Sequence, residues 1–180
     1  MYGHIFAGME RFVSDTYGSK AWAKVVNEAG AGIEKYLILQ EYPDSEVESL
    51  ITTISGVAGK SSQDIQFELG QFMAEYFART YKVFFKPSWD FYELLENVEN
   101  TVHRELRLYN PGMTPPELSC SRVGSREVLI KYNSPRHMCA FARGLVQGFA
   151  THYGEEIEIV EDDCMLDGKK ECLIKVKGGG

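Results

Sequence analysis

The sequence predicts an α+β fold, in which a helical N-terminal part packs on a C-terminal four-stranded antiparallel sheet with one long helix. Apolar residues recur at helical spacing from residue 3 to about 108, and the period shortens to two after residue 117. The later elements follow the order strand, strand, helix, strand, strand, which is typical of an antiparallel sheet covered by a helix. Residues 109–117 are too few to separate the two parts, so we expect them to pack together as one domain.

Helices are expected to begin at residue 3 and to cover residues 21–30, 45–58, 61–81 and 88–109. The second and third end at Gly30 and Gly59, because glycine is favoured just beyond a helix C-terminus. The fourth opens with a capping pattern, in which Ser61 is followed three residues later by Asp64. The prolines after residue 110 end the fifth.

Two hairpins and one helix are expected after residue 117. Residues 118–123 and 126–132 alternate in polarity around a Gly124-Ser125 turn, and residues 155–162 and 171–177 do the same around a second turn. Residues 136–153 lie between the hairpins and have helical spacing.

Composition excludes several classes of protein. The formal net charge of -7 argues against nucleic acid as a partner. Charged residues at Glu10, Arg11 and Asp15 interrupt any signal peptide, and no apolar segment is long enough to span a bilayer. We therefore expect a cytoplasmic protein that does not act at a membrane, whose four cysteines are free thiols or metal ligands rather than disulfides.

Residues 132–136, YNSPR, place a phenol, a hydroxyl and a guanidinium at alternate positions. Pro135 disfavours a helical conformation at Ser134 and suits the first turn of a helix. Tyr132 and Ser134 should then share one face of an extended segment, with Arg136 in the first helical turn. Together they would bind a carboxylate or a phosphate. The alternative is a strand that ends in a solvated arginine.

His103 lies in the helix expected over residues 88–109, near the edge of its apolar stripe. Alone it is more often a partly buried, hydrogen-bonded histidine. It precedes YNSPR by about thirty residues, follows an MYGHI N-terminus, and is followed by a proline pair at Pro115 and Pro116. With these features the whole chain resembles the H-NOX family, haem nitric oxide/oxygen binding domains related to the haem domain of soluble guanylate cyclase.

The resemblance implies a single H-NOX domain over residues 1–180, with a mobile helical subdomain over 1–65 and a haem-binding core over 66–180. Haem b would lie between the two parts. Gly70, within the fourth helix, would suit a pivot between them, although close helix packing explains a glycine there equally well.

The resemblance also assigns roles to individual residues. His103 would be the proximal ligand of the haem iron, and Tyr132, Ser134 and Arg136 would bind the haem propionates. Pro116 would press on the proximal face of the haem. A neutral imidazole and a permanently charged guanidinium suit these two tasks.

The distal wall of such a pocket decides which gas it binds. Oxygen-binding relatives have a distal tyrosine supported by a tryptophan and an asparagine, and these positions fall on Phe141, Met9 and Met73. The other expected lining residues are also apolar: Ile5, Phe77 and Leu145. We therefore expect a sensor that binds nitric oxide and carbon monoxide and excludes oxygen. His4 is the remaining polar candidate, and we expect it outside the pocket.

The cysteines permit a zinc site. Cys164 and Cys172 flank a hairpin turn, and Cys139 lies near the start of the helix on the same sheet. Some members of the resembled family bind zinc through cysteines at these positions, with a histidine just before the third. An acidic run stands there instead, and Glu161 is the first candidate for fourth ligand. The alternative is three reduced thiols packed between helix and hairpin.

We expect the chain to signal through a separate protein or to be part of a larger one. The resemblance suggests a histidine kinase or a diguanylate cyclase or phosphodiesterase, which are bacterial signalling enzymes, as the effector. We expect no enzymatic activity, because the chain offers no grouped nucleophile, base and oxyanion donors. The competing hypothesis is a haem-free small-molecule binding module of the four-vinyl-reductase-like type, which has a similar cysteine pattern but needs neither His103 nor Arg136.

Overall fold

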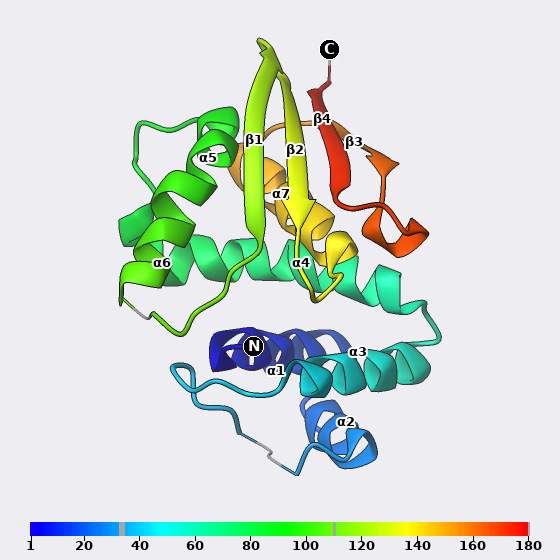
Figure 1. Ribbon diagram of the computed structural model, residues 1–180. Coiled ribbons are helices and arrows are strands. Elements are labelled where there is room, and N and C mark those ends of the chain that lie inside the picture. The colour runs from blue at the N-terminus through cyan, green and yellow to red at the C-terminus, as the bar shows by residue number, and fades with distance from the viewer. Residues whose placement is uncertain (33–34, 110, 180) are drawn as a thin grey trace. The chain divides into compact units, whose positions relative to one another are not determined.

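The structure is a computed structural model that describes residues 1–32, 35–109 and 111–179 of the chain (Figure 1). It contains helices and a four-stranded antiparallel sheet, which confirms the predicted fold class. The chain divides into two compact units, Met1–Leu69 and Gly70–Gly180. In the described part of the chain, no helix combines the length and the apolar character needed to cross a membrane.

The first unit is helical. It comprises the helices α1 (Gly3–Tyr17), α2 (Ala21–Ala29) and α3 (Asp44–Ala58), together with the first half of α4 (Ser62–Thr80).

The predicted helix ends are confirmed. Gly30 and Gly59 both adopt the left-handed conformation, with φ of 65° and 67°, which ends α2 and α3. The Ser61 hydroxyl accepts a hydrogen bond from the Asp64 amide, and the Asp64 carboxylate accepts from the Ser61 amide. These reciprocal bonds satisfy two amides at the start of α4, as a capping box requires.

Aromatic side chains form one part of the core of the first unit. The Phe6 and Tyr36 rings stack with their centroids 4.3 Å apart, and Tyr42 and Trp22 pack edge-on against Tyr36. The Tyr36 hydroxyl donates to the Glu46 carboxylate over 2.6 Å, so its polar end is satisfied. These contacts tie the segment between α2 and α3 to both helices.

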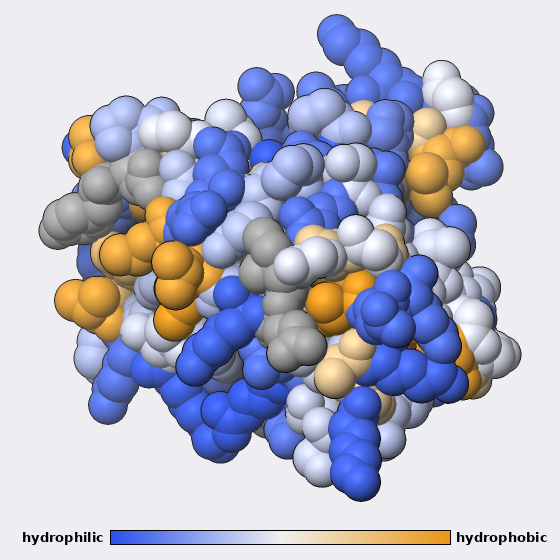
Figure 2. Space-filling model, turned by 90° about the horizontal axis from the view of Figure 1, so that it is seen from below, coloured by the Kyte–Doolittle hydropathy of each residue, from blue (hydrophilic) through white to orange (hydrophobic). Residues whose placement is uncertain are grey.

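Part of that segment is exposed and apolar. Leu37, Ile38 and Leu39 directly follow the buried Tyr36, and their exposed fractions are 62%, 46% and 82%. Figure 2 shows hydrophobic residues on the surface of the molecule seen from below, in patches surrounded by polar ones. Single exposed hydrophobic residues are ordinary on a protein surface, whereas three consecutive ones are unusual.

The helix expected over residues 88–109 is not one regular helix, so that prediction was wrong in detail. A 3-10 turn, η1 (Lys82–Phe84), is followed by α5 (Phe91–Asn97), a π-helix η2 (Val98–His103) and α6 (Arg104–Tyr109).

The helix begins three residues later than expected because Asp90 caps it. The Asp90 carboxylate accepts from the Glu93 amide at 2.7 Å, and the Glu93 carboxylate accepts from the Asp90 amide at 2.9 Å. The π-helical turn ends at His103. Such turns are rare and frequently mark functional sites.

The C-terminal sheet has the strand order β1-β2-β4-β3, with all neighbours antiparallel (Figure 1). Both predicted hairpins are confirmed. The strands and the helix between the hairpins are β1 (Glu117–Gly124), β2 (Glu127–Asn133), α7 (Cys139–Tyr153), β3 (Ile157–Asp163) and β4 (Cys172–Gly178), with a 3-10 turn η3 (Met165–Asp167) before β4.

The start predicted for α7, residue 136, was wrong by three residues. His137 has a φ of 51°, in the left-handed region, and a helix cannot run through a residue in that conformation. Its amide donates to the Ser134 carbonyl, which closes a turn around Pro135 and Arg136. Arg136 therefore lies in this turn and not in a helix.

One face of the sheet forms the core of the second unit. Inward residues alternate along β2 and β4, as a half-buried strand requires. They pack in one cluster with buried residues of α5 and α7: Val128, Ile130, Tyr132, Cys172, Ile174, Val176, Phe91, Leu94, Leu95, Val146 and Phe149.

Glycines allow α4 and α7 to approach closely. A Cβ atom on Gly70 would lie 2.8 Å from the Leu145 amide nitrogen and closer still to the Phe141 carbonyl oxygen. A Cβ atom on Gly148 would lie 2.6 Å from the Ala74 methyl group. Close helix packing therefore accounts for the glycine at position 70.

We expect Gly70→Ala to lower the free energy of unfolding by about 1–3 kcal/mol, because the new methyl group must displace backbone atoms of α7. Gly56→Ala on α3 is the matched control. Nothing lies within 4 Å of its added Cβ, so it should leave the protein as stable or up to about 1 kcal/mol more stable. Urea denaturation measures both variants, and equal stability would contradict the close packing.

Candidate functional site

His103 ends the π-helical turn with one ring nitrogen already bonded. Its Nδ1 lies 2.9 Å from Oε2 of Glu99, and its side chain is 12% exposed. No described residue forms a hydrogen bond with Nε2. The ring is thus held from one side and presents its other nitrogen to a ligand.

The Glu99 carboxylate has two further donors. Oε1 accepts from Arg107 Nη1 at 2.8 Å, and Oε2 accepts from the Leu118 amide at 3.2 Å. Burial opposes ionisation of this group, but the three donors outweigh it and lower the pKa of Glu99 to about 2. An ionised carboxylate only accepts hydrogen bonds, so Nδ1 of His103 must carry the proton.

This hydrogen bond decides the chemistry of the imidazole. With the proton on Nδ1, the lone pair of the neutral ring lies on Nε2, which is the form that binds a metal ion. Histidines that ligate metals almost always donate their other nitrogen to a carboxylate or a carbonyl. The geometry around His103 therefore fits an iron ligand.

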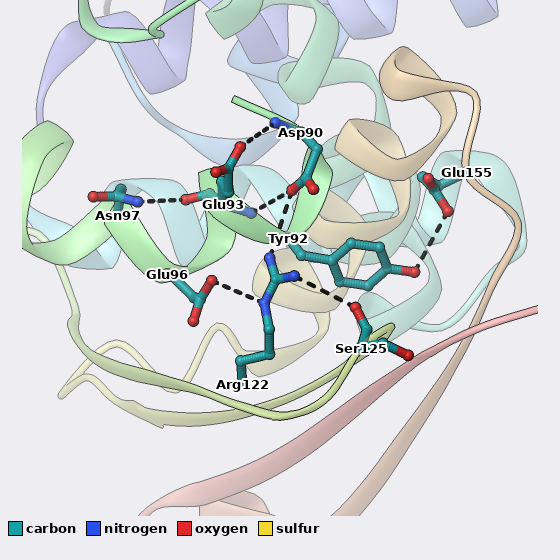
Figure 3. Close-up of polar contacts among 8 residues, drawn as sticks. All are labelled: Asp90, Tyr92, Glu93, Glu96, Asn97, Arg122, Ser125 and Glu155. Atoms are coloured by element: carbon teal, nitrogen blue, oxygen red, sulfur yellow. Dashed lines mark hydrogen bonds and ion pairs between the residues drawn. The ribbon is translucent and has the colours of Figure 1, made fainter. Parts of the chain in front are cut away.

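The helix that leads to His103 is fastened to the sheet (Figure 3). Arg122 on β1 reaches Glu96 at 3.0 Å and Asp90 at 3.6 Å, and its guanidinium lies 5.3 Å from the centroid of the Tyr92 ring. Together with the Glu99–Leu118 bond, these contacts anchor α5 and η2 to β1 at several points.

In the YNSPR motif, which the sequence predicted to be a cradle for an acidic ligand, Arg136 stands in a turn and not in a helix. Tyr132 and Ser134 are both buried, and their hydroxyl groups are hydrogen-bonded to each other. Burial raises the pKa of Tyr132 to about 12, so its phenol remains a proton donor at neutral pH. The Ser134 hydroxyl accepts from the Arg136 amide at 3.3 Å.

Arg136 links this cradle to the segment that follows α6. Its Nη1 donates to the Thr114 carbonyl at 2.7 Å, and its Nη2 to the Thr114 hydroxyl at 3.0 Å. Pro115 and Pro116 come next and are half-buried. A guanidinium and two hydroxyls on one turn suit the paired carboxylates of a haem, so this donor set also fits the group.

The expected distal residues lie in both units, and all six are buried or half-buried. In the second unit Met73 and Phe141 are buried, and Phe77 and Leu145 pack against the core. In the first unit Ile5 and Met9 lie on the buried face of α1. His4 beside them is half-buried, and burial followed by the N-terminal ammonium lowers its pKa to about 4. Its imidazole is therefore neutral at pH 7.

The structure brings Cys139, Glu161, Cys164 and Cys172 together. One ligand atom from each lies within 4.8 Å of all the others. The Sγ atoms of Cys139 and Cys164 are 3.7 Å apart, and those of Cys164 and Cys172 are 3.9 Å apart. Tetrahedral zinc with bonds of about 2.3 Å holds its sulfur ligands roughly 3.8 Å apart.

The cysteine cluster suits either a zinc site or three reduced thiols packed together. Burial, reinforced by the neighbouring thiols, raises the pKa of Cys139, and burial also raises the pKa of Cys172. Oε1 of Glu161 is buried and lacks a hydrogen-bond partner among the described residues, while Oε2 lies 3.5 Å from Arg143 Nε. A buried carboxylate oxygen left unsatisfied beside three thiols fits a metal ligand.

Sequence reasoning missed Glu99, Thr114 and Arg143. Glu99 had a signal, because it lies four residues before His103 and such pairs meet on a helix. Thr114 and Arg143 had none, since their partners are 22 and 18 positions away in the chain.

Comparison with known proteins places the chain in a family. The sequence model of the HNOB family, described as haem-NO-binding, matches residues 2–161. Soluble guanylate cyclase 89Da of Drosophila melanogaster is 23% identical over 185 residues, which cover 99% of the chain and 28% of that protein. Soluble guanylate cyclase 89Db of the same species is 21% identical over 138 residues, or 76% of the chain and 20% of that protein. The chain thus spans less than a third of these relatives.

Solved structures share the fold over the whole chain. An H-NOX protein from S. oneidensis in the Fe(II)NO ligation state superposes with a TM-score of 0.94 at 24% identity and covers 100% of both chains. The unliganded Fe(II) H-NOX protein from K. algicida gives 0.88 at 22% identity, covering 100% of this chain and 97% of that one.

Proposed function

Because the chain belongs to the haem-NO-binding family, the H-NOX domains, we propose that it is a gas sensor that holds haem b through His103 and responds to nitric oxide. The observation that carries the proposal is the hydrogen bond between Glu99 and His103 Nδ1, which leaves Nε2 for the iron. Ferrous haem supplies an open iron position for a diatomic gas.

Residues of the second unit would hold different parts of the haem. His103 would hold the iron. Arg136 would bind the propionates with permanent charge, and the hydroxyls of Tyr132 and Ser134 would donate to the same carboxylates. Pro116 would pack against the ring.

Selectivity between gases follows from the side chains assigned to the distal wall. Oxygen on ferrous haem carries partial negative charge and needs a hydrogen-bond donor, whereas nitric oxide binds strongly without one. Phe141, Met9 and Met73 offer no donor. The missing bond costs roughly 1.5–3 kcal/mol, or about ten- to more than a hundred-fold in affinity, which favours exclusion of oxygen.

The signal is proposed to pass to a separate effector protein, a histidine kinase or a diguanylate cyclase or phosphodiesterase. No enzymatic activity is proposed for this chain. The haem-free alternative of the four-vinyl-reductase-like type is not favoured, because the match to a haem-NO-binding family extends over residues 2–161 and the geometry of His103 suits a metal.

We also propose that Cys139, Cys164 and Cys172 bind zinc together with Glu161. The support is the agreement between the observed sulfur separations and tetrahedral zinc, with the unsatisfied Glu161 oxygen beside them. Zinc would replace the protons of the three thiols and tie α7 to the β3–β4 hairpin.

We expect His103→Ala to lose stable haem binding, because no other described side chain presents a comparable imidazole. Added imidazole should restore the haem by taking the place of the lost ring. The control is His152→Ala, since His152 is an exposed residue of α7 that pairs with Glu75. The measurement is the absorption spectrum of each ferrous protein. A His103→Ala spectrum identical to that of the parent would show that His103 is not the iron ligand.

The ferrous protein should bind nitric oxide and carbon monoxide but form no stable oxygen complex in air. The nitric oxide form should be five-coordinate at ambient temperature, as seen by its absorption spectrum. Phe141→Tyr should gain only weak oxygen binding, because Met9 and Met73 cannot orient the new hydroxyl. A persistent oxygen complex of the parent protein would contradict the donor-free wall.

Protein purified without chelator should contain close to one zinc per chain by elemental analysis. Cys164→Ala should lose the metal, because it removes the thiol that neighbours both of the others. Cys120→Ala is the matched control, since Cys120 lies on β1 outside the cluster and should keep the zinc. If the parent protein contains no zinc, keeps all three thiols reduced and is as stable as when zinc is added, the proposed zinc site is rejected.

A further inference from the structure

We propose that Glu99 is a positioning residue that sets the strength of the bond between His103 and the haem iron, and with it the ease with which nitric oxide releases that histidine. The inference rests on the proposed function in one respect, namely that His103 is the iron ligand. It adds a residue outside the iron's coordination sphere that tunes the response.

The geometry makes Glu99 a strong acceptor for His103. The Nδ1–Oε2 distance of 2.9 Å is that of a charge-assisted hydrogen bond, and both side chains are mostly shielded from solvent. An anionic acceptor draws the Nδ1 proton toward itself and leaves more electron density on the ring. Nε2 then becomes a stronger donor to iron than the nitrogen of an imidazole bonded to a neutral carbonyl group.

The other partners of Glu99 control how strongly it acts. Arg107 binds Oε1 and withdraws negative charge from the carboxylate, while the Leu118 amide fixes Oε2 in place beside the ring. Arg107 is 39% exposed, so its charge is partly screened and the carboxylate keeps most of its own. Glu99 therefore strengthens the donation of His103 to iron, and Arg107 weakens it.

The contact also holds the ring in one orientation. Glu99 and His103 belong to the same π-helical turn, and Leu118 opens β1, so the imidazole cannot rotate about its Cβ–Cγ bond without losing a bond to an element anchored in the sheet. Release of His103 from iron must work against this restraint and against the stronger bond. Glu99 thus delays release.

The test uses the full haem-loaded chain and readouts other than signalling. Resonance Raman spectroscopy of the gas-free ferrous protein measures the iron–histidine stretching frequency, and potentiometry measures the reduction potential. Glu99→Gln should lower the frequency and raise the potential, because the amide keeps the shape but not the charge. The rate at which nitric oxide releases His103 should rise about 10- to 100-fold.

Arg107→Gln supplies the opposite prediction, since it leaves the Glu99 charge unopposed. The frequency should rise and the potential should fall, which a merely structural role for either residue does not produce. Glu96→Gln is the matched control, because Glu96 lies on the same helical segment and bonds Arg122 but does not contact His103. It should change neither quantity.

The outcomes separate this inference from the proposed function. If His103→Ala loses the haem while Glu99→Gln and Arg107→Gln both keep the parent's frequency and potential, His103 is the ligand and the role of Glu99 is rejected. If Glu99→Gln folds poorly, Glu99→Asp and Arg107→Gln decide: a lowered frequency in the first and a raised one in the second support the inference, and unchanged values overturn it.

Discussion

The half-buried carboxylate of Glu99 is the interaction on which the candidate haem site depends. It joins three segments, since its donors come from the end of η2, from α6 and from the start of β1. Burial alone would favour its protonated form, and the donors keep it ionised instead. Its charge then decides which nitrogen of His103 bears the proton, so one carboxylate sets both the position and the chemistry of the ligand.

The same helical segment is fastened to β1 at its N-terminal end. The Asp90–Glu93 capping box fixes where α5 begins, and Arg122 binds the Asp90 and Glu96 carboxylates while lying over Tyr92. Individually such partly exposed ion pairs stabilise little. As a network they define the path of the helix along the strand, which means that any displacement of His103 must be accommodated at β1.

The two candidate ligand sites share one turn. Ser134 and Arg136 belong to the proposed propionate cradle, and Cys139, three residues further on, begins α7 and enters the cysteine cluster. Between them His137 holds the left-handed conformation that delays the helix, and the Cys139 thiol lies 3.7 Å from its carbonyl oxygen. A metal in the cluster would therefore stiffen the chain from which the cradle is built.

The sequence by itself determined the features that depend on near neighbours. The α+β order, the glycine ends of α2 and α3, the Ser61 cap and both hairpins follow from spacing and local conformational preference, and the YNSPR residues could be proposed from the sequence as an acid-binding motif. Tertiary structure decided what depends on distant partners. It set the π-helical turn at His103, the close approach of α7 to Gly70 and the gathering of three thiols with Glu161, because burial and long-range contacts outweigh local propensity at these positions.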